Sequence, residues 1–366
     1  MREQRKFPWQ TLLRLLIGVT LLAWIFHSIF LDEAKNAWRG SQPAWEQLTR
    51  SEQWQLAWTK GPGQLWTTIR QIDPGAFGLS LVCVGLTILI GIIRWRIVLR
   101  AQSLSLSFMR IAEISLVAQF FNSFLLGSTG GDLFKAYYAA RETHHKKTEA
   151  VVTVVIDRLL GLFSMLLFAC VLILPNLALV TSYKKFGAVA AVVFAMLIAC
   201  GAIVMFSFRA GVSRRFPQAR QLLRRLPKGD SIERAIDAAR LFSQQPFFLS
   251  QTLGLSMILN AICVLQVWLL ARGLGLTVPI LPLSMIVPMV TCLSALPVSI
   301  SGLGTRETLF VLMLSVPEIN VPETAALSIS LLTFAGGLFW SVIGGIVYLT
   351  RKKRDHLEDI SDSEEA

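Results

Sequence analysis

Six long apolar stretches dominate this sequence and constrain its fold more than any other feature. Each has about 20 residues or more, the length that an α-helix needs to cross roughly 30 Å of hydrocarbon. They cover Leu12–Leu31, Gly75–Leu99, Val151–Leu174, Phe186–Phe208, Phe247–Ala271 and Thr324–Thr350. Because 54% of the 366 residues are apolar and only 16% are charged, we expect an all-α integral membrane protein with six full transmembrane helices.

The formal net charge of +12 is gathered in clusters at the ends of these stretches. Such clusters mark the cytoplasmic side of a membrane protein, and they argue against a nucleic-acid partner. This pattern predicts a protein of the plasma (bacterial inner) membrane with both termini in the cytoplasm. The basic clusters are Arg94 to Arg110, Arg141 to Lys147, Arg209 to Arg240 and Arg351 to Arg354.

The predicted topology divides the chain into four parts. Residues 1–31 hold the cytoplasmic N-terminal end and the first span, and residues 75–350 form the main membrane domain, with a basic cytoplasmic loop at 209–245. Residues 32–74 form an external segment with five tryptophans, which we expect to lie along the outer interface; stacking on a sugar or peptide is the alternative. Residues 351–366 form a basic and then acidic cytoplasmic tail, predicted to be disordered.

Two further apolar segments, Phe108–Gly127 and Leu281–Leu314, are interrupted by glycine, proline or charge. Each begins and ends on one side of the predicted membrane and is too short to cross and return. We therefore expect two re-entrant helical hairpins that enter from opposite faces, an arrangement typical of inverted-repeat transporters. Glycine permits tight turns and close backbone approach, and the predicted turn residues are Gly127, Gly130, Gly131, Gly302 and Gly304.

Ionisable residues at membrane depth are costly, and they usually face a cavity or an ionic partner. Arg158 lies about 16 Å along a helix from Lys147, so it and Asp157 are predicted near mid-bilayer. The alternative for Arg158 is a structural ion pair with Asp132 or Glu113. Asp132 is also suited to capping the returning helix of the first hairpin, and Lys135 to extending its ammonium group to the interface.

Arg306 and Glu307 open the returning helix of the second hairpin, with Thr305 as its expected cap. Free N–H groups at a helix N-terminus and an arginine side chain suit a phosphate. A simple Arg306–Glu307 pair that holds the hairpin together is the alternative. The predicted substrate-binding residues are therefore Asp132, Lys135, Asp157, Arg158, Arg306 and Glu307.

Three segments, GSTGGDLFKA, VIDRLLGLF and ALPVSISGLGTRE, resemble the flippase-like family, which contains the transmembrane domain of lysylphosphatidylglycerol synthase. The resemblance extends from about Asp73 to Arg351. The sequence departs from the family pattern at Lys135, where arginine is common, and at Ser301, where glycine is common. The resemblance implies a lipid-translocating role, and we expect a stand-alone member without the synthase domain.

The expected function is therefore flippase-like or scramblase-like movement of a lipid with an anionic or phosphate-bearing headgroup. Phosphate-binding P-loop, H-E-x-x-H and G-x-S-x-G motifs are absent from the sequence, and we expect neither enzymatic activity nor a cofactor or metal. The alternatives are a membrane enzyme that acts on a polyprenyl-phosphate or glycolipid, and an accessory factor in envelope biosynthesis. Expected partners are membrane lipids, with a second copy or an envelope-synthesis enzyme as further candidates.

Overall fold

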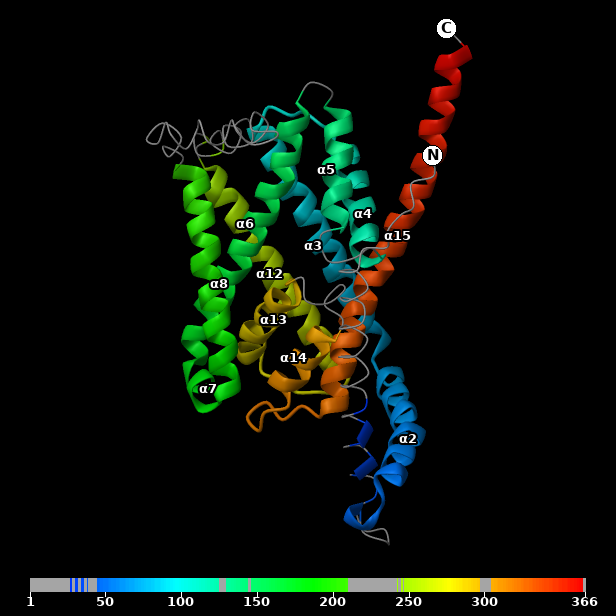
Figure 1. Ribbon diagram of the computed structural model, residues 1–366, viewed down its shortest axis with the longest axis vertical. Coiled ribbons are helices and arrows are strands. Elements are labelled where there is room, and N and C mark those ends of the chain that lie inside the picture. Colours follow the sequence, from blue (N-terminus) through cyan, green and yellow to red (C-terminus); the bar gives the residue numbers. More distant parts are fainter. Residues whose placement is uncertain are drawn as a thin grey trace, which may run out of the picture.

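The computed structural model describes residues 45–124, 130–143, 146–209, 247–296 and 304–364, together with isolated positions 27, 30, 31, 34, 35, 38, 242 and 245. Every regular element in this part of the chain is a helix. The helices form an elongated bundle, and Figure 1 shows α15 running along one side of it and beyond one end. The all-α prediction is confirmed for the described residues.

Five helices are long and apolar enough to cross a membrane. They occupy five of the six stretches predicted as spans, whereas the predicted span Leu12–Leu31 lies almost wholly outside the described residues. The second of the five continues through a 3-10 turn, Leu174–Asn176, into α7 (Leu177–Ser182). The five are α3 (Pro74–Ala101), α6 (Lys147–Ile173), α8 (Lys184–Arg209), α12 (Phe248–Gly273) and α15 (Glu323–Glu364).

Two pairs of shorter helices occupy the two segments for which the sequence predicts hairpins. The first pair is α4 (Phe108–Phe124) with α5 (Gly130–Glu142), and the second is α13 (Ile280–Ser294) with α14 (Thr305–Leu314). The helices of each pair contact one another, and Figure 1 shows the pairs in opposite halves of the bundle. None of these helices exceeds 17 residues, so each is shorter than a full span.

Glycines permit both pairs for two different reasons. Gly304 has a φ of +82°, in the region that favours glycine, and it directly precedes α14. Gly304, and not the predicted Thr305, is therefore the N-cap residue of α14. Gly131 instead allows close packing, because a Cβ there would lie 2.0 Å from the carbonyl oxygen of Ala118 on α4. Gly130 opens α5 beside it, whereas Gly127 and Gly302 lie outside the described residues.

Helix α4 is packed just as closely against α15. A Cβ at Gly344 would lie 2.1 Å from the carbonyl oxygen of Leu116, and the Oγ atoms of Ser123 and Ser341 are 2.6 Å apart. Small residues at a helix contact allow backbones to approach in this way. The first helix pair is therefore fixed in place through α4, which lies between α5 and α15.

We expect the substitution Gly344→Ala to destabilise the protein by about 1–3 kcal/mol, because overpacking at a backbone contact forces the two helices apart. Thermal unfolding in detergent micelles measures the effect. Gly337→Ala is the matched control, since it lies on the same helix and a Cβ there meets nothing within 4 Å. Equal melting temperatures for the two variants would contradict the close contact of α4 with α15.

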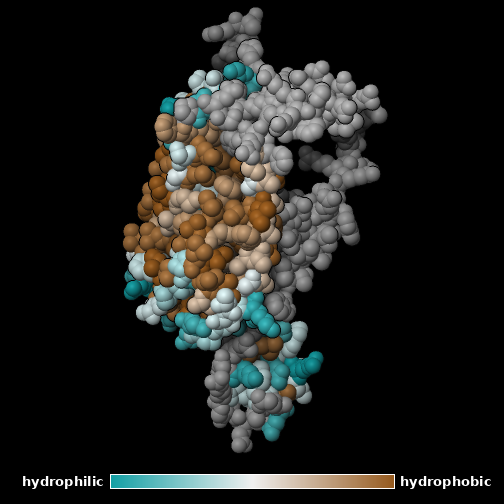
Figure 2. All heavy atoms as spheres, turned by 90° about the vertical axis from the view of Figure 1, so that its left-hand side faces the viewer, coloured by the Kyte–Doolittle hydropathy of each residue, from teal (hydrophilic) through white to brown (hydrophobic). Residues whose placement is uncertain are grey.

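The outer surface has the polarity expected of a membrane protein. Figure 2 shows a broad hydrophobic band over the middle of the bundle and hydrophilic residues beyond it at both ends. Large exposed side chains such as Leu79, Val82, Phe194 and Ile346 contribute to the apolar surface. The basic ends of α3, α8 and α15 and the α5–α6 connection lie at one end of the bundle (Figure 1), which agrees with their predicted location on one side.

The segment before α3 forms a separate projecting helix, α2 (Arg50–Arg70). Thr49 caps it, and hydrogen bonds from the Thr49 backbone N–H and hydroxyl lower the pKa of Glu52. Figure 1 shows α2 extending away from the α14 end of the bundle. Its location along the outer membrane interface stays a prediction. Only three residues separate α2 from α3, which leaves little chain for a sharp change of direction.

Helix α15 continues through the C-terminal tail to Glu364. Extending an existing helix avoids the unfavourable nucleation step. The disorder that the composition of residues 351–366 suggests stays a prediction.

Candidate functional site

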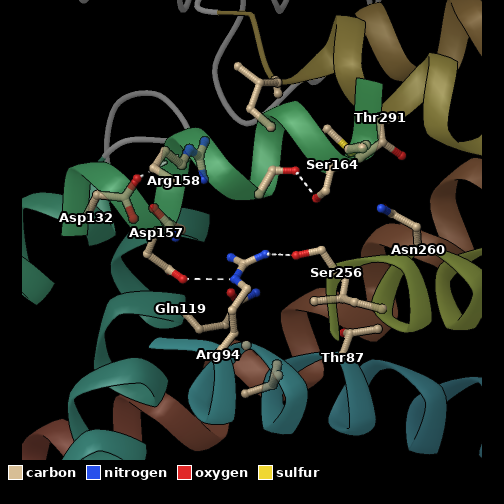
Figure 3. Close-up of a pocket in the computed structure, with 18 of the residues that line it drawn as sticks. Thr87, Arg94, Gln119, Asp132, Asp157, Arg158, Ser164, Ser256, Asn260 and Thr291 are labelled. Atoms are coloured by element: carbon tan, nitrogen blue, oxygen red, sulfur yellow. Dashed lines mark hydrogen bonds and ion pairs between the residues drawn. The ribbon is translucent and has the colours of Figure 1, made fainter. Parts of the chain in front are cut away.

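A polar cavity of about 610 Å³ lies inside the bundle (Figure 3). Helices α3, α4, α5, α6, α8, α12 and α13 contribute to its wall. Three of the four short helices and four of the five long apolar helices therefore meet around one space. Its polar and charged lining consists of Thr87, Arg94, Ser115, Gln119, Asn122, Asp132, Lys135, Asp157, Arg158, Ser164, Ser256, Asn260 and Thr291.

Asp157 is the centre of the charged part of this cavity. Only 6% of the surface of Asp157 is exposed. Its carboxylate accepts hydrogen bonds from Arg94 Nε at 2.9 Å and from Lys135 Nζ at 3.2 Å. These contacts join α6 to α3 and α5. Because each buried cation has a carboxylate within hydrogen-bonding distance, the desolvation of all three charges is partly offset.

Arg94 also reaches across the cavity to α12, where its Nη1 donates to Ser256 Oγ at 2.9 Å. Figure 3 shows its guanidinium group between Asp157 and Ser256. A Cβ at Gly161 on α6 would lie 3.0 Å from Nη2 of Arg94, so glycine leaves room for this group. The planar guanidinium fork thus faces a confined space with two of its nitrogens already oriented.

Lys135 is held from two sides. Its ammonium group contacts Asp157 and lies 4.1 Å from the centre of the Trp95 ring, whose residue is fully buried. A cation over an aromatic face is stabilised by the quadrupole of the ring. The ammonium group of Lys135 therefore points into the protein. It does not extend toward the membrane interface, which was the alternative for this residue.

Arg158 and Asp132 form a second and more open pair. Arg158 Nε lies 3.5 Å from Asp132 Oδ2, and the two side chains are 45% and 25% exposed. Arg158 thus forms the ion pair with Asp132 that was one alternative to a substrate-binding role. Asp132 lies in the first turn of α5, where a carboxylate favours the positive end of the helix dipole, but it is not the N-cap residue.

Glu113, the other predicted partner of Arg158, lies in a different cluster. Arg110 Nη1 is 3.0 Å from Glu113 Oε2, and Arg110 Nη2 is 2.5 Å from Glu142 Oε1. These ion pairs join the beginning of α4 to the end of α5. They hold the outer end of the first helix pair together and do not contribute to the wall of the cavity.

Arg306 and Glu307 are also separate from the cavity, because neither residue is part of its lining. Glu307 is fully buried, and it accepts hydrogen bonds from the Gly304 N–H at 2.7 Å, from Arg306 Nη2 at 2.5 Å and from Ser330 Oγ at 3.2 Å. The Arg306 guanidinium lies 4.9 Å from the centre of the Phe334 ring. This clamp, formed by Arg306, Glu307 and Ser330, fixes α14 to α15.

The structure therefore brings together four of the six predicted site residues. Asp132, Lys135, Asp157 and Arg158 line one cavity, whereas Arg306 and Glu307 form a clamp with the hydrogen bonds expected of a structural pair. The six residues that the sequence predicts as substrate-binding therefore do not all line one cavity.

Comparison with known proteins adds the family to this geometry. Residues 53–345 match the family model described as the lysylphosphatidylglycerol synthase TM region. The chain belongs to this family. The match covers the cavity, the clamp and both short helix pairs, and it confirms the resemblance inferred from the three sequence segments.

Two relatives are similar over most of their length. A UPF0104 membrane protein of Methanocaldococcus jannaschii is 23% identical over 292 residues, which cover 73% of this chain and 83% of the relative. A UPF0104 membrane protein of Methanothermobacter thermautotrophicus is 20% identical over 297 residues, which cover 74% and 83% respectively.

Several cavity residues of this family member were not predicted as site residues. Arg94 was assigned to a basic cluster that fixes topology, although it lies about 10 Å before the end of its helix, a depth that could have identified it. Gln119 and Asn122 are amide residues on α4, and amides in membrane helices commonly form hydrogen bonds between helices. Asn122 does so, since its Oδ1 accepts from the Gly131 N–H at 2.8 Å, and both residues also line the cavity.

Proposed function

We propose that this protein moves a lipid with an anionic, phosphate-bearing headgroup across the membrane, in the manner of a flippase or scramblase. One observation carries the proposal: the described lining of the cavity contains three cations, Arg94, Lys135 and Arg158, but only two carboxylates, Asp132 and Asp157. An excess of one positive charge inside an apolar bundle favours an anion in the cavity.

The geometry suggests how a phosphate would bind. Arg94 and Lys135 both contact Asp157, so a phosphate that enters this cluster can accept hydrogen bonds from the same two cations. Arg158 is more exposed and can supply a third contact from the edge of the cavity. Charge-assisted hydrogen bonds of this kind replace the hydration that the headgroup loses.

The proposal includes a placement in the membrane. The basic end of the bundle would face the cytoplasm, with both termini on that side, and the plasma membrane would be its location. The two short helix pairs would be re-entrant hairpins that enter from opposite faces and are related as inverted repeats. Their helices α4, α5 and α13, which line the cavity, would also line the path of the headgroup. The acyl chains would stay in the bilayer.

Reconstitution in liposomes tests the proposal. The test lipid is phosphatidylglycerol with a fluorescent nitrobenzoxadiazole group on its acyl chain. When the protein is present, external dithionite should remove more than the half of the fluorescence that comes from the outer leaflet. Protein-free liposomes should stop at that half, because an isolated charged headgroup crosses hydrocarbon very slowly. The assay is run with and without an imposed proton gradient, since the energy source is part of the question.

Two outcomes would contradict the proposal. If labelled lipid stays in its leaflet under both conditions, translocation of this lipid class is excluded. If chromatography of the recovered lipid instead reveals a covalently changed headgroup, the protein is an enzyme, as the alternative interpretation of the sequence holds. Unchanged lipid that becomes accessible only in the presence of protein supports the transporter.

A further inference from the structure

The cavity has a second, uncharged polar end. Figure 3 shows Asp132, Asp157 and Arg158 on one side of Arg94 and Ser164, Asn260 and Thr291 on the other. Ser164 follows Asp157 by seven residues on α6, and Thr87 precedes Arg94 by seven residues on α3. Seven residues are two helical turns, so the uncharged end lies roughly 10 Å from the charged cluster.

The hydroxyl groups at this end are oriented by their own helices. Thr87 Oγ1 donates to the Val84 carbonyl at 2.7 Å, Ser164 Oγ to the Gly161 carbonyl at 2.9 Å, and Thr291 Oγ1 to the Val287 carbonyl at 2.7 Å. Each hydroxyl hydrogen is thereby used, and the oxygen lone pairs remain available. The uncharged end therefore offers acceptors to the donors of a ligand.

Asn260 adds both donors and an acceptor. Its residue is only 7% exposed, it lines the cavity, and Figure 3 shows its amide pointing into the space. No hydrogen bond of this amide occurs within the described part of the structure. An amide that faces a cavity without a protein partner is available to a ligand, and a ligand hydroxyl group can both donate to and accept from it.

We propose that the headgroup taken by this cavity is a phosphodiester with a neutral, hydroxyl-rich substituent, such as glycerol, inositol or a sugar. The inference rests on the proposed function and specifies its substrate class. The phosphate occupies the Arg94–Lys135–Arg158 cluster, and the polyol hydroxyls bond to Asn260 and the oriented hydroxyls two turns away.

An ammonium headgroup is a poorer match for the same space. The two lining carboxylates both belong to the charged cluster, where they already contact cations, and the described lining contains no aromatic side chain. A choline or ethanolamine group at the uncharged end would therefore find neither an anion nor a cation–π partner. A headgroup with a bare phosphate would leave Asn260 without a partner.

A headgroup series in the liposome assay tests this specificity with the unaltered protein. Acyl-labelled phosphatidylglycerol and phosphatidylinositol should move roughly 5- to 10-fold faster than phosphatidic acid, phosphatidylethanolamine or phosphatidylcholine, the effect of one or two lost hydrogen bonds. A glycolipid with a sugar phosphodiester forms a third polyol arm. The same lipids, added to protein in detergent, should raise the melting temperature in the same order, which measures binding without transport.

The outcomes separate the two proposals. If all five phospholipids move at equal rates and stabilise equally, the polyol inference is wrong while lipid translocation stands. If none of them moves, the proposed function fails. If only phosphatidylglycerol and phosphatidylinositol stabilise the protein although nothing moves, the polyol site stands as a binding site alone.

Variants at Asn260 sharpen the test. Asn260→Leu should slow phosphatidylglycerol about 5-fold, for the loss of one or two hydrogen bonds, and leave phosphatidic acid unchanged. Asn260→Asp should shift the preference toward phosphatidylethanolamine by placing an anion at the uncharged end. Gln251→Ala is the matched control, because Gln251 is an exposed amide on the same helix. An equal slowing of phosphatidylglycerol and phosphatidic acid by Asn260→Leu would overturn the assignment.

Discussion

The substitution Asp157→Asn should lower the free energy of unfolding by about 3–5 kcal/mol, the range observed when one member of a buried ion pair is removed. Asp157 is the carboxylate that contacts both Arg94 and Lys135, whose side chains are only 12% and 11% exposed. Asparagine keeps the shape of the side chain but leaves two cations close together without their anion. Thermal and denaturant unfolding in detergent micelles measure the loss.

The proposed phosphate site makes this variant unusually responsive to lipid. A phosphate can replace the missing carboxylate between Arg94 and Lys135, so phosphatidylglycerol should restore more of the melting temperature in Asp157→Asn than it adds to the unaltered protein. Phosphatidylcholine, whose headgroup carries a compensating ammonium, is the control lipid. Equal responses of the variant to both lipids would show that the cluster stabilises the fold without binding an anion.

The double variant Arg94→Met with Asp157→Asn separates charge imbalance from loss of packing. Removing both charges should recover part of the stability lost in Asp157→Asn, because one uncompensated cation is removed with the anion. A double variant that is less stable than either single variant would indicate that the hydrogen bonds between α3, α6 and α12, and not charge balance, determine the effect.

The main helices were predictable from the sequence because hydrophobic length is a local property. A run such as Gly75–Leu99 must be helical in hydrocarbon, since its backbone groups have no water to bond, and α3 occupies that run. The two short helix pairs were predictable from glycine and charge inside otherwise apolar segments. The position of Asp157 and Arg158 well inside a long apolar helix followed from counting residues along α6.

The partners of those charges were not predictable in this way. Arg94 and Ser256 are 162 residues apart in the sequence, and their contact depends on how α3 and α12 pack together. The same holds for Arg306, which looked like a phosphate ligand because it follows a glycine turn. Its contacts with Ser330 and Phe334 on α15 appear only when the helices are assembled.

The direction of two outlying segments depends on the helix that each adjoins. The tail after Thr350 continues the helix already formed by α15, and the short connection to α3 directs α2 away from the bundle (Figure 1). Composition alone, which suggested an interfacial segment and a disordered tail, contains no information about these directions.

Arg94 and Arg306 should respond to substitution in opposite ways. In Arg94→Ala, Asp157 keeps its contact with Lys135, so the fold is largely preserved. The phosphate site, however, loses charge-assisted hydrogen bonds worth about 1.5–3 kcal/mol, and lipid movement should fall roughly 10- to 150-fold. Arg94→Lys should recover only part of the rate, because an ammonium group lacks the planar fork.

In Arg306→Ala, the fully buried carboxylate of Glu307 loses its only cation within the described structure. The expected result is a loss of about 3–5 kcal/mol of stability and less folded protein in the membrane, with a transport rate per folded molecule close to that of the unaltered protein. Fluorescence-detected size-exclusion chromatography gives the folded amount, and the dithionite assay at matched amounts gives the rate. Glu307→Gln in the Arg306→Ala background should restore part of the stability by removing the buried charge. If Arg306→Ala at matched amount slows lipid as strongly as Arg94→Ala, then Arg306 belongs to the lipid path, as its position after the glycine turn first suggested.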